Sequence, residues 1–155
     1  MRSSNLENFP DTKKSLGEVS EKFIKIWGFD PTELKISDEY ARGFTQIPNR
    51  IYKYLPRLGI GGNQSGLAIL LFYIISRDFD GKGNSFPGIR TIASEIDSSP
   101  GTVGRNLRKL KKLGLIEIRQ RRTKRGQFTN VYTWKGFKKK MIGFMIEDGL
   151  IDNRK

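Results

Sequence analysis

Residues 85–122, SFPGIRTIASEIDSSPGTVGRNLRKLKKLGLIEIRQRR, contain two short helical patterns, with a tight turn between them and a strand pattern after them. In the first pattern the apolar residues recur at i, i+3, i+4 and i+7, which is the spacing of one face of an α-helix. These residues are Ile89, Ile92, Ala93 and Ile96. The polar segment Asp97-Ser98-Ser99 follows, and its composition predicts a turn. The stretch therefore predicts a helix, a turn and a second helix in close succession.

The second helix has sequence signals at both of its ends. Ser99 is a suitable N-cap, and Pro100 occupies the first helical position, where a missing N–H costs nothing. Gly114 favours a helix end, because glycine readily adopts the left-handed backbone of a C-terminal cap. The residues expected to face the core are Val103, Leu107, Leu110 and Leu113. The opposite face then consists largely of cationic side chains.

A β-hairpin is expected directly after this helix. Residues 115–119 alternate between apolar and polar side chains, and residues 128–134 alternate again. The basic segment 121–127 joins the two strands as a loop that turns at Gly126. A helix, a turn, a basic helix and a hairpin in this order are typical of a winged helix-turn-helix.

Further helical patterns flank this core at residues 16–27, 51–55, 65–79 and 137–146. Residues 65–79 are apolar almost all round, as in a central core helix, whereas residues 31–49 have no sustained period and indicate a connector. The expected fold class is α+β, mostly α: a winged helix-turn-helix with additional N- and C-terminal helices. The expected parts are an N-terminal helical extension at 1–43, the winged helix-turn-helix domain at 44–134, and a C-terminal helix and tail at 135–155.

The positive charge of the chain is concentrated in one segment. The chain has 29 Lys and Arg against 16 Asp and Glu, a net charge of +13. Residues 99–140 contain 14 Lys and Arg and one acidic residue, Glu117, so this segment accounts for the whole excess. Such an excess favours a polyanionic partner. The alternative is a solvated basic face that only aids solubility.

The residue types that are absent exclude several kinds of chemistry. The sequence has no Cys and no His, which excludes disulfides, thiolate chemistry and a zinc site built from His and Cys. It also lacks the imidazole that most often acts as a general base near neutral pH. Because Glu117 stands alone in the basic region, a two-metal nuclease has no obvious ligands there. We therefore expect a protein that is no enzyme and holds no metal and no cofactor.

No segment has the pattern of a membrane span or a secretory signal. The longest apolar run, Leu67 to Ile75, is far shorter than the roughly 20 residues that a spanning helix needs. The N-terminus begins with polar residues and lacks an apolar signal core. We expect a cytoplasmic protein without a membrane partner.

The outward face of the second helix supplies the candidate DNA-binding residues. Arg105 and Asn106 are expected at base edges, because Arg pairs with guanine and Asn with adenine. Thr102 and the N–H groups near Pro100 suit a phosphate at the positive helix end. The other candidates on the helix are Arg108, Lys109 and Lys112, and those of the predicted wing are Arg119, Arg121, Arg122, Lys124 and Arg125.

Two glycines in the second helix need an explanation. Gly101 and Gly104 each destabilise a helix by about 1 kcal/mol relative to Ala. Either they allow the helix backbone to approach DNA closely, in which case Gly101 belongs to the DNA-binding surface, or they allow another helix to pack tightly. Lys138, Lys139 and Lys140 are expected on the solvent side of the last helix.

Residues 44–134 resemble the helix-turn-helix domain of plasmid and phage replication initiators and related winged-helix proteins. The matching stretches are FTQIPNRIYKYLPRLG at 44–59, GLAILLFYIISR at 66–77, residues 85–122 quoted above, and GQFTNVYTW at 126–134. The resemblance implies that Thr102, Arg105 and Asn106 match positions that face DNA in such domains. Gly88 and Gly104 depart from the pattern, which usually has Ser or another polar residue there.

These observations predict a non-enzymatic protein that binds double-stranded DNA. Its expected role is replication initiation, or an accessory role in transfer or partition, on a plasmid or phage. Two alternatives stay open: a transcriptional regulator of the same fold, and a winged-helix module that binds protein or RNA. The last helix either pairs two chains into a homodimer or folds back onto the domain, because its apolar residues need a cover. These residues are Phe137, Met141, Phe144 and Met145.

Overall fold

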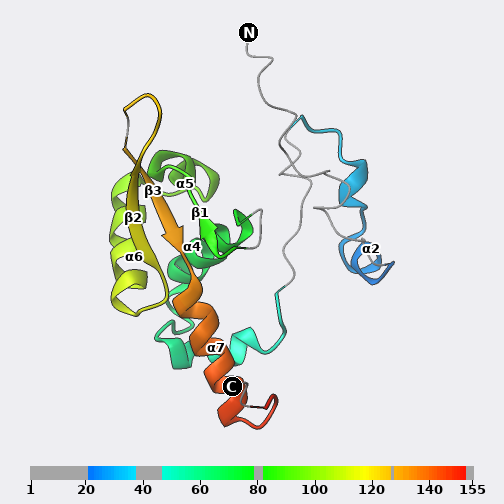
Figure 1. Cartoon of the computed structure of the whole chain (residues 1–155). Helices are drawn as coiled ribbons and strands as arrows, with labels where there is room; N and C mark the ends of the chain where they lie inside the picture. The colour runs from blue at the N-terminus through cyan, green and yellow to red at the C-terminus, as the bar shows by residue number, and fades with distance from the viewer. Residues whose placement is uncertain (1–20, 38–46, 79–81, 127, 153–155) are drawn as a thin grey trace. The chain divides into compact units, whose positions relative to one another are not determined.

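The computed structural model describes residues 21–37, 47–78, 82–126 and 128–152 (Figure 1). Contacts within the chain divide it into two compact units, Met1–Gln46 and Ile47–Lys155. The division into parts at 1–43, 44–134 and 135–155 stays a prediction.

The first unit contains the helix α2, Glu21–Trp27, and the 3-10 helix η2, Pro31–Glu33. α2 ends where the sequence predicts, and Gly28 follows it with a φ of +77°. The expected start of this helix, at residues 16–20, lies outside the described residues. No residue of α2 is buried. The ring centroid of Phe23 lies 6.3 Å from the ring centroid of Trp27 and 6.0 Å from that of Phe29. These contacts of α2 are local contacts between aromatic rings.

The second unit contains the described strands and most of the described helices. The elements, in chain order, are α3 (Ile51–Tyr54), η4 (Pro56–Leu58), α4 (Ser65–Ser76), β1 (Asn84–Ser85), α5 (Ile89–Glu95), α6 (Pro100–Lys112), β2 (Glu117–Arg122), β3 (Phe128–Thr133) and α7 (Lys135–Glu147). α6 runs alongside β2, and the β2-β3 hairpin extends beyond the helices at the end opposite to α7 (Figure 1).

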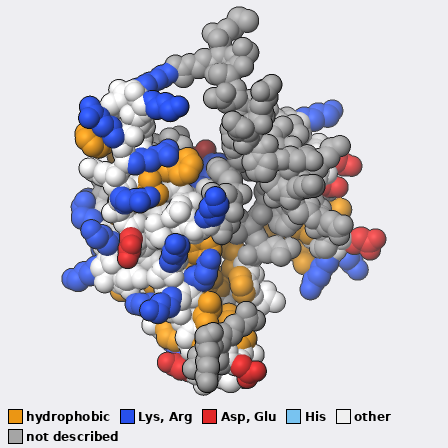
Figure 2. Space-filling model, viewed as in Figure 1, with side chains coloured by type: hydrophobic (Ala, Val, Ile, Leu, Met, Phe, Trp, Pro, Cys, Tyr) orange, Lys and Arg blue, Asp and Glu red, His pale blue; other side chains and the backbone are white. Residues whose placement is uncertain are grey.

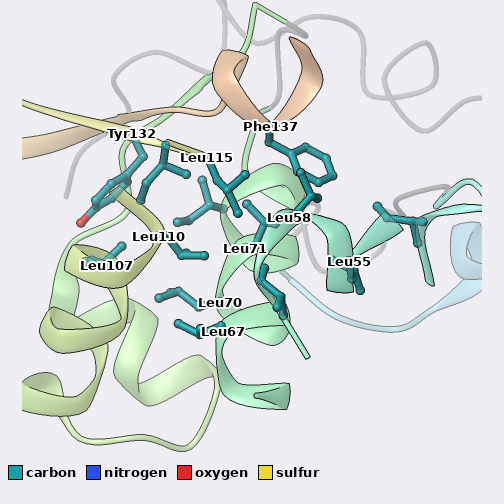
Figure 3. Packing of buried hydrophobic residues seen from close by; sticks show 14 of the residues in the cluster. Leu55, Leu58, Leu67, Leu70, Leu71, Leu107, Leu110, Leu115, Tyr132 and Phe137 are labelled. Carbon is teal, nitrogen blue, oxygen red and sulfur yellow. The ribbon is translucent and has the colours of Figure 1, made fainter. Parts of the chain in front are cut away.

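α4 lies at the centre of the hydrophobic core. Its buried residues pack in one cluster with side chains of α3, α6 and the sheet (Figure 3). They are Leu67, Leu70, Leu71 and Ile74. The sequence predicts a helix buried on every side, but Ile69 is 52% exposed, because the cluster covers the opposite side of α4. The helix ends at Ser76, and the rest of its predicted span includes Phe79, which lies outside the described residues.

α5 and α6 form the predicted helix-turn-helix. The turn between them contains Asp97, a non-glycine residue with a φ of +51°. Ser99 caps α6 as expected, because its hydroxyl accepts a hydrogen bond of 3.1 Å from the N–H of Thr102. After α6 the chain turns at Gly114, which has a φ of +73°. The residues of α6 that are buried are Val103, Leu107 and Leu110, as the spacing predicts.

The described strands form one antiparallel sheet in the order β1-β3-β2. β2 and β3 make the predicted hairpin, with pairs from Glu117↔Thr133 to Arg122↔Phe128. The sequence gives no signal for β1, because a two-residue strand carries no alternation and is defined only by its pairing with β3. The predicted fold class is confirmed: the second unit is a mostly helical α+β structure with a three-stranded antiparallel sheet, consistent with a winged helix.

The structure corrects both limits of the predicted first strand. Leu115 does not pair with β3, because its N–H donates to the carbonyl of Leu110 at 3.1 Å and its carbonyl accepts from the N–H of Phe137 at 3.0 Å. At the other end, β2 continues through Arg121 and Arg122, which the sequence predicts in the loop. A turn closed by the hydrogen bond from Gly126 N–H to the Thr123 carbonyl, 2.9 Å, leaves these two arginines in the strand.

α7 folds back onto the junction between α6 and β2. Besides the bond from Phe137 to Leu115, Lys140 Nζ donates to the carbonyl of Leu113, 2.7 Å away at the end of α6. A Cβ placed on Gly136 would overlap the carbonyl oxygen of Gly114. Phe137 and Met141 are buried in the core of the same chain. The homodimer through the terminal helices stays a prediction.

Because the backbone of Gly136 closely approaches that of Gly114, one added methyl group at residue 136 should strongly affect stability. Gly136→Ala should lower the free energy of unfolding by about 1–3 kcal/mol, because two backbone segments must separate to admit the methyl group. The matched control is Gly143→Ala in the same helix, where a Cβ meets nothing within 4 Å. This control should raise stability by up to about 1 kcal/mol. Urea unfolding followed by circular dichroism measures both, and equal effects would contradict the close packing.

The end of α7 is attached to α3 and η4 by a polar and aromatic cluster. The buried Tyr54 hydroxyl donates to Asp148 Oδ2 at 2.8 Å. Arg57 forms ion pairs with Glu147 at 2.8 Å and with Asp148 at 3.2 Å. Its guanidinium carbon also lies 4.2 Å from the ring centroid of Phe144. The hydrogen bond from Tyr54 and, after it, the bonds and charge of Arg57 hold the pKa of Asp148 below its usual value, whereas desolvation opposes this shift.

This cluster predicts an acid-dependent loss of stability. A carboxylate with a lowered pKa in the folded chain stabilises it above the unfolded pKa, and this contribution disappears as the pH falls through the folded pKa. Asp148→Asn should therefore flatten the dependence of unfolding free energy on pH between about pH 5 and about pH 2. Asp152→Asn, which removes an equal charge from an exposed position, is the control and should leave the slope unchanged. Thermal unfolding across this range tests the prediction.

Candidate nucleic-acid interface

α6 separates its apolar and cationic residues onto two faces. Val103, Leu107 and Leu110 are buried, whereas every Arg and Lys of the helix is exposed. These exposed residues are Arg105, Arg108, Lys109, Lys111 and Lys112. Since α6 contains no acidic residue, its outward face is cationic along its length. Pro100 and Gly101, at the start of the helix, are exposed as well.

The start of α6 holds a chain of hydrogen bonds that orients Arg105. The Ser99 hydroxyl donates to Thr102 Oγ1 at 2.9 Å, and Arg105 Nη2 donates to the same oxygen at 3.1 Å. All three side chains are exposed or half-buried. Arg105 is thus held against the first turn of the helix by the hydroxyl of Thr102.

Asn106 lies at the boundary between two helices and is half-buried. Its Nδ2 is 3.6 Å from the position of a Cβ on Gly66, at the start of α4. The side chain of Asn106 therefore lies on the side of α6 that adjoins α4. Arg105, by contrast, lies on the exposed side of the helix.

Gly101 and Gly104 have no helix packed against them in the described part of the chain. A Cβ on Gly101 would meet Arg105 Nη1 at 4.0 Å, and one on Gly104 would meet Arg108 Nη1 at 3.6 Å. Both distances are ordinary van der Waals contacts with flexible side-chain ends. Of the two explanations that the sequence leaves open, tight packing of another helix thus has no support among these contacts.

The hairpin divides its arginines between two faces of the sheet. Side chains alternate along a strand, and paired residues of neighbouring strands share a face. Arg122 pairs with Phe128 and is on the same face as Tyr132, which packs with Leu107 and Leu110 in the core (Figure 3). Arg119 and Arg121 are on the other face. The hairpin arginines therefore do not form one surface, although they are close in sequence.

The tip of the hairpin lies at the same end of the unit as the start of α6. α6 and β2 run in opposite directions from the turn at Gly114, so the first turn of α6 and the end of β2 both lie toward the end of the unit that is opposite to this turn (Figure 1). Lys124 and Arg125 are exposed in the tip, and Arg122 Nη2 lies 3.6 Å from the Cβ position of Gly126. The tip and the first turns of α6 thus offer cationic groups at one end of the second unit.

Two aromatic residues beside these arginines are not predicted as surface residues by the sequence. The guanidinium carbon of Arg121 lies 4.4 Å from the ring centroid of Phe86, in the segment between β1 and α5. Phe128, next to Arg122 on β3, is 68% exposed. The alternating pattern of residues 128–134 includes Phe128 and predicts it in a strand. The local sequence Phe86-Pro87-Gly88 contains no signal that Phe86 contacts the hairpin.

The charge distribution over the second unit is uneven. Lys and Arg side chains spread over the face that carries α6 and the hairpin, and acidic side chains gather around the end of α7 (Figure 2). Lys138, Lys139 and Lys140 of α7 are exposed as predicted, but Lys140 caps α6 and Lys138 Nζ lies 4.7 Å from the ring centroid of Trp134. Two of these three lysines therefore have structural contacts.

The described residues contain no group of His, Cys, Asp or Glu that could hold a metal ion. Within the same residues, no helix has both the length and the apolar character needed to cross a membrane.

The sequence matches the model of a known family. The family model of the DnaD N-terminal domain matches residues 47–149, about two thirds of the chain. A search of curated proteins finds no match.

The two glycines of α6 predict opposite effects on stability and binding. Gly101→Ala and Gly104→Ala should each raise the free energy of unfolding by up to about 1 kcal/mol, because alanine favours a helix and meets only mobile guanidinium groups. If the glycines serve a close approach of DNA, affinity for duplex DNA should fall in the same variants. Urea unfolding and fluorescence anisotropy measure the two effects. An affinity that is unchanged, or higher, would contradict the close approach.

Proposed function

We propose, since the chain belongs to the DnaD N-terminal domain family, that it binds double-stranded DNA through α6 and the tip of the β2-β3 hairpin during replication initiation. The family's N-terminal domain is a non-catalytic domain of replication initiation proteins. The binding surface and its ligand are the parts that this proposal adds.

The observation that carries the proposal is the two-faced character of α6. Its apolar side chains are buried, and its exposed face bears five cationic residues and no acidic one. A helix that presents such a face at the surface has the size and the charge to enter the major groove, which is about 12 Å wide. Neutralisation of phosphates supplies most of the affinity in such a complex.

Within α6 the residues would have different roles. Arg105 is exposed in the second turn, where a helix inserted in the groove contacts base edges, and it is the main candidate for reading a guanine. Asn106 adjoins it on the side of α4 and would read the neighbouring base. The remaining candidates contact phosphates: the N–H groups near Pro100 and Gly101, the hydroxyl of Thr102, and the side chains of Arg108, Lys109 and Lys112.

The hairpin would contribute through its tip. Arg122, Lys124 and Arg125 lie toward the end of the second unit where α6 begins, so they can contact the flanking backbone or minor groove of the same duplex. Arg119 and Arg121 are on the face of the sheet that points away from the core. We therefore leave both residues out of the proposed duplex contacts, although the sequence alone predicts them there.

The setting of this activity is a separate question. The resemblance to plasmid and phage initiators favours a mobile element, where the protein would act at an origin or in transfer or partition. A transcriptional regulator of the same fold would instead protect DNA that overlaps a promoter. Footprinting on the DNA that surrounds the coding sequence separates these two roles.

The proposal predicts a steep dependence of duplex affinity on salt and on two arginines. If about six phosphates are neutralised, log K should fall with log salt at a slope near −5. Arg105→Ala combined with Arg122→Ala should lower the affinity for duplex DNA at least about tenfold in moderate salt. Fluorescence anisotropy with a labelled duplex selected from a random pool measures both quantities.

The control for this experiment is the double variant Lys53→Ala plus Lys139→Ala. It removes the same charge from exposed positions of α3 and α7 and should change the affinity much less. A salt slope shallower than about −2 would contradict binding by phosphate neutralisation. An unaltered affinity of the Arg105 and Arg122 variant would favour the winged-helix module that binds protein or RNA.

A further inference from the structure

The outer face of the sheet carries a small aromatic and cationic surface that the proposed duplex contacts do not use. Ser85 pairs with Tyr132, and both are completely buried on the core side. The next residue, Phe86, points to the opposite side and is 52% exposed. We define the outer sheet face by Phe86, Arg119, Arg121, Thr129 and Val131.

Arg121 is held in place on this face by two contacts. Its guanidinium lies over the ring of Phe86, with 4.4 Å from the guanidinium carbon to the centroid, and its Nε donates to Thr129 Oγ1 at 3.3 Å. Within the described part of the chain this hydrogen bond uses Nε alone, which leaves the terminal nitrogens for another acceptor. The side chain is thus oriented before any ligand arrives, although it is exposed.

Arg119 extends the same surface along β2. It pairs with Val131 of β3. Val131 is on the outer side of the sheet and does not belong to the main core cluster, yet its side chain is buried. Val131 therefore forms a small apolar floor next to two arginines. Glu117 begins β2 on this face, so the cationic part extends from Arg119 toward the hairpin tip.

From this arrangement we infer that the outer sheet face binds single-stranded DNA. An unpaired base would stack on the guanidinium of Arg121, which the Phe86 ring supports from below, and the terminal nitrogens of Arg121 and the side chain of Arg119 would contact the adjoining phosphates. Bases of single strands stack on aromatic rings and on arginine guanidinium planes, with cationic side chains along the backbone. The outer sheet face contains both elements.

The geometry distinguishes this ligand from the duplex. The faces of bases are hidden inside a duplex, so a stacking surface has nothing to bind there. Arg119 and Arg121 also point away from the side of the sheet on which Tyr132 packs with α6. Since the chain belongs to a family of replication initiation proteins, the strand that matches this chemistry is DNA opened at an origin. The inference does not depend on duplex binding by α6.

The experiment uses the full chain and a fluorescein-labelled single strand of about 20 thymidines. Phe86→Leu removes the ring but keeps an apolar side chain, and Arg121→Lys keeps the charge but removes the planar guanidinium. Each should weaken single-strand binding about fivefold or more, as expected for the loss of one stacking contact. Each should leave the affinity for duplex DNA within about twofold, because neither change removes a cationic charge or touches α6.

Arg122→Ala is the matched control, one residue further along β2 and on the other face of the sheet. It should weaken duplex binding and leave single-strand binding nearly unchanged. Thermal unfolding of each variant shows that the fold is retained. As a second readout, a bromodeoxyuridine-labelled strand should crosslink to peptides that contain Phe86 or Arg121.

Several results would overturn the inference. Full single-strand affinity in Phe86→Leu and Arg121→Lys would show that the surface attracts charge without stacking a base. An equal loss of duplex binding in these variants would mean that the two ligands share one site. Tighter binding of a uridine strand of the same length would make RNA, rather than DNA, the ligand. If duplex binding is absent while the outer-face variants still lower single-strand affinity, the function proposed for α6 fails and this inference stands.

Discussion

The close contact between backbone segments at Gly114 and Gly136 is the constraint on which the geometry of the second unit depends. Gly114 takes a left-handed backbone and ends α6, and Leu115 then donates back to α6 and accepts from Phe137 of α7. A side chain on Gly136 would force the two segments apart. One short turn thus joins the end of α6, the start of β2 and the start of α7, and it sets how α6 lies against the sheet.

The position of α6 follows from this junction and from the core. Leu107 and Leu110 pack with Tyr132 of the sheet, while Lys140 of α7 caps the end of the helix (Figure 3). α6 is therefore held at its end and along its inner face, and its first turn is free of such contacts with α7. The apolar residues of α6 are buried on its inner face, and the cationic residues are therefore exposed on its outer face. A rigid scaffold with an exposed cationic helix is what binding to a polyanion requires.

The hairpin shows how one cationic segment of sequence can supply two surfaces. Arg121 and Arg122 are neighbours in the chain, yet the pleat of the strand directs one toward Phe86 and the other to the side of Tyr132. A surface for a duplex and a surface for an unpaired strand can therefore exist on a single domain without competing for the same side chains. For a non-catalytic domain of replication initiation proteins, contact with both forms of DNA at one origin is physically consistent with its role.

The features that the sequence determined by itself are local ones. The caps at Ser99 and Gly114, the buried residues of α6 and the helix-turn-helix follow from spacing and from backbone preferences, which act over a few residues. The concentration of charge in residues 99–140 is likewise a property of the chain alone. Tertiary structure decided what depends on partners far apart in the sequence: the pairing that makes β1 a strand, the later start of β2, and the contact of Phe86 with Arg121. These contacts form because folding brings distant segments together, and no periodicity within either segment encodes them.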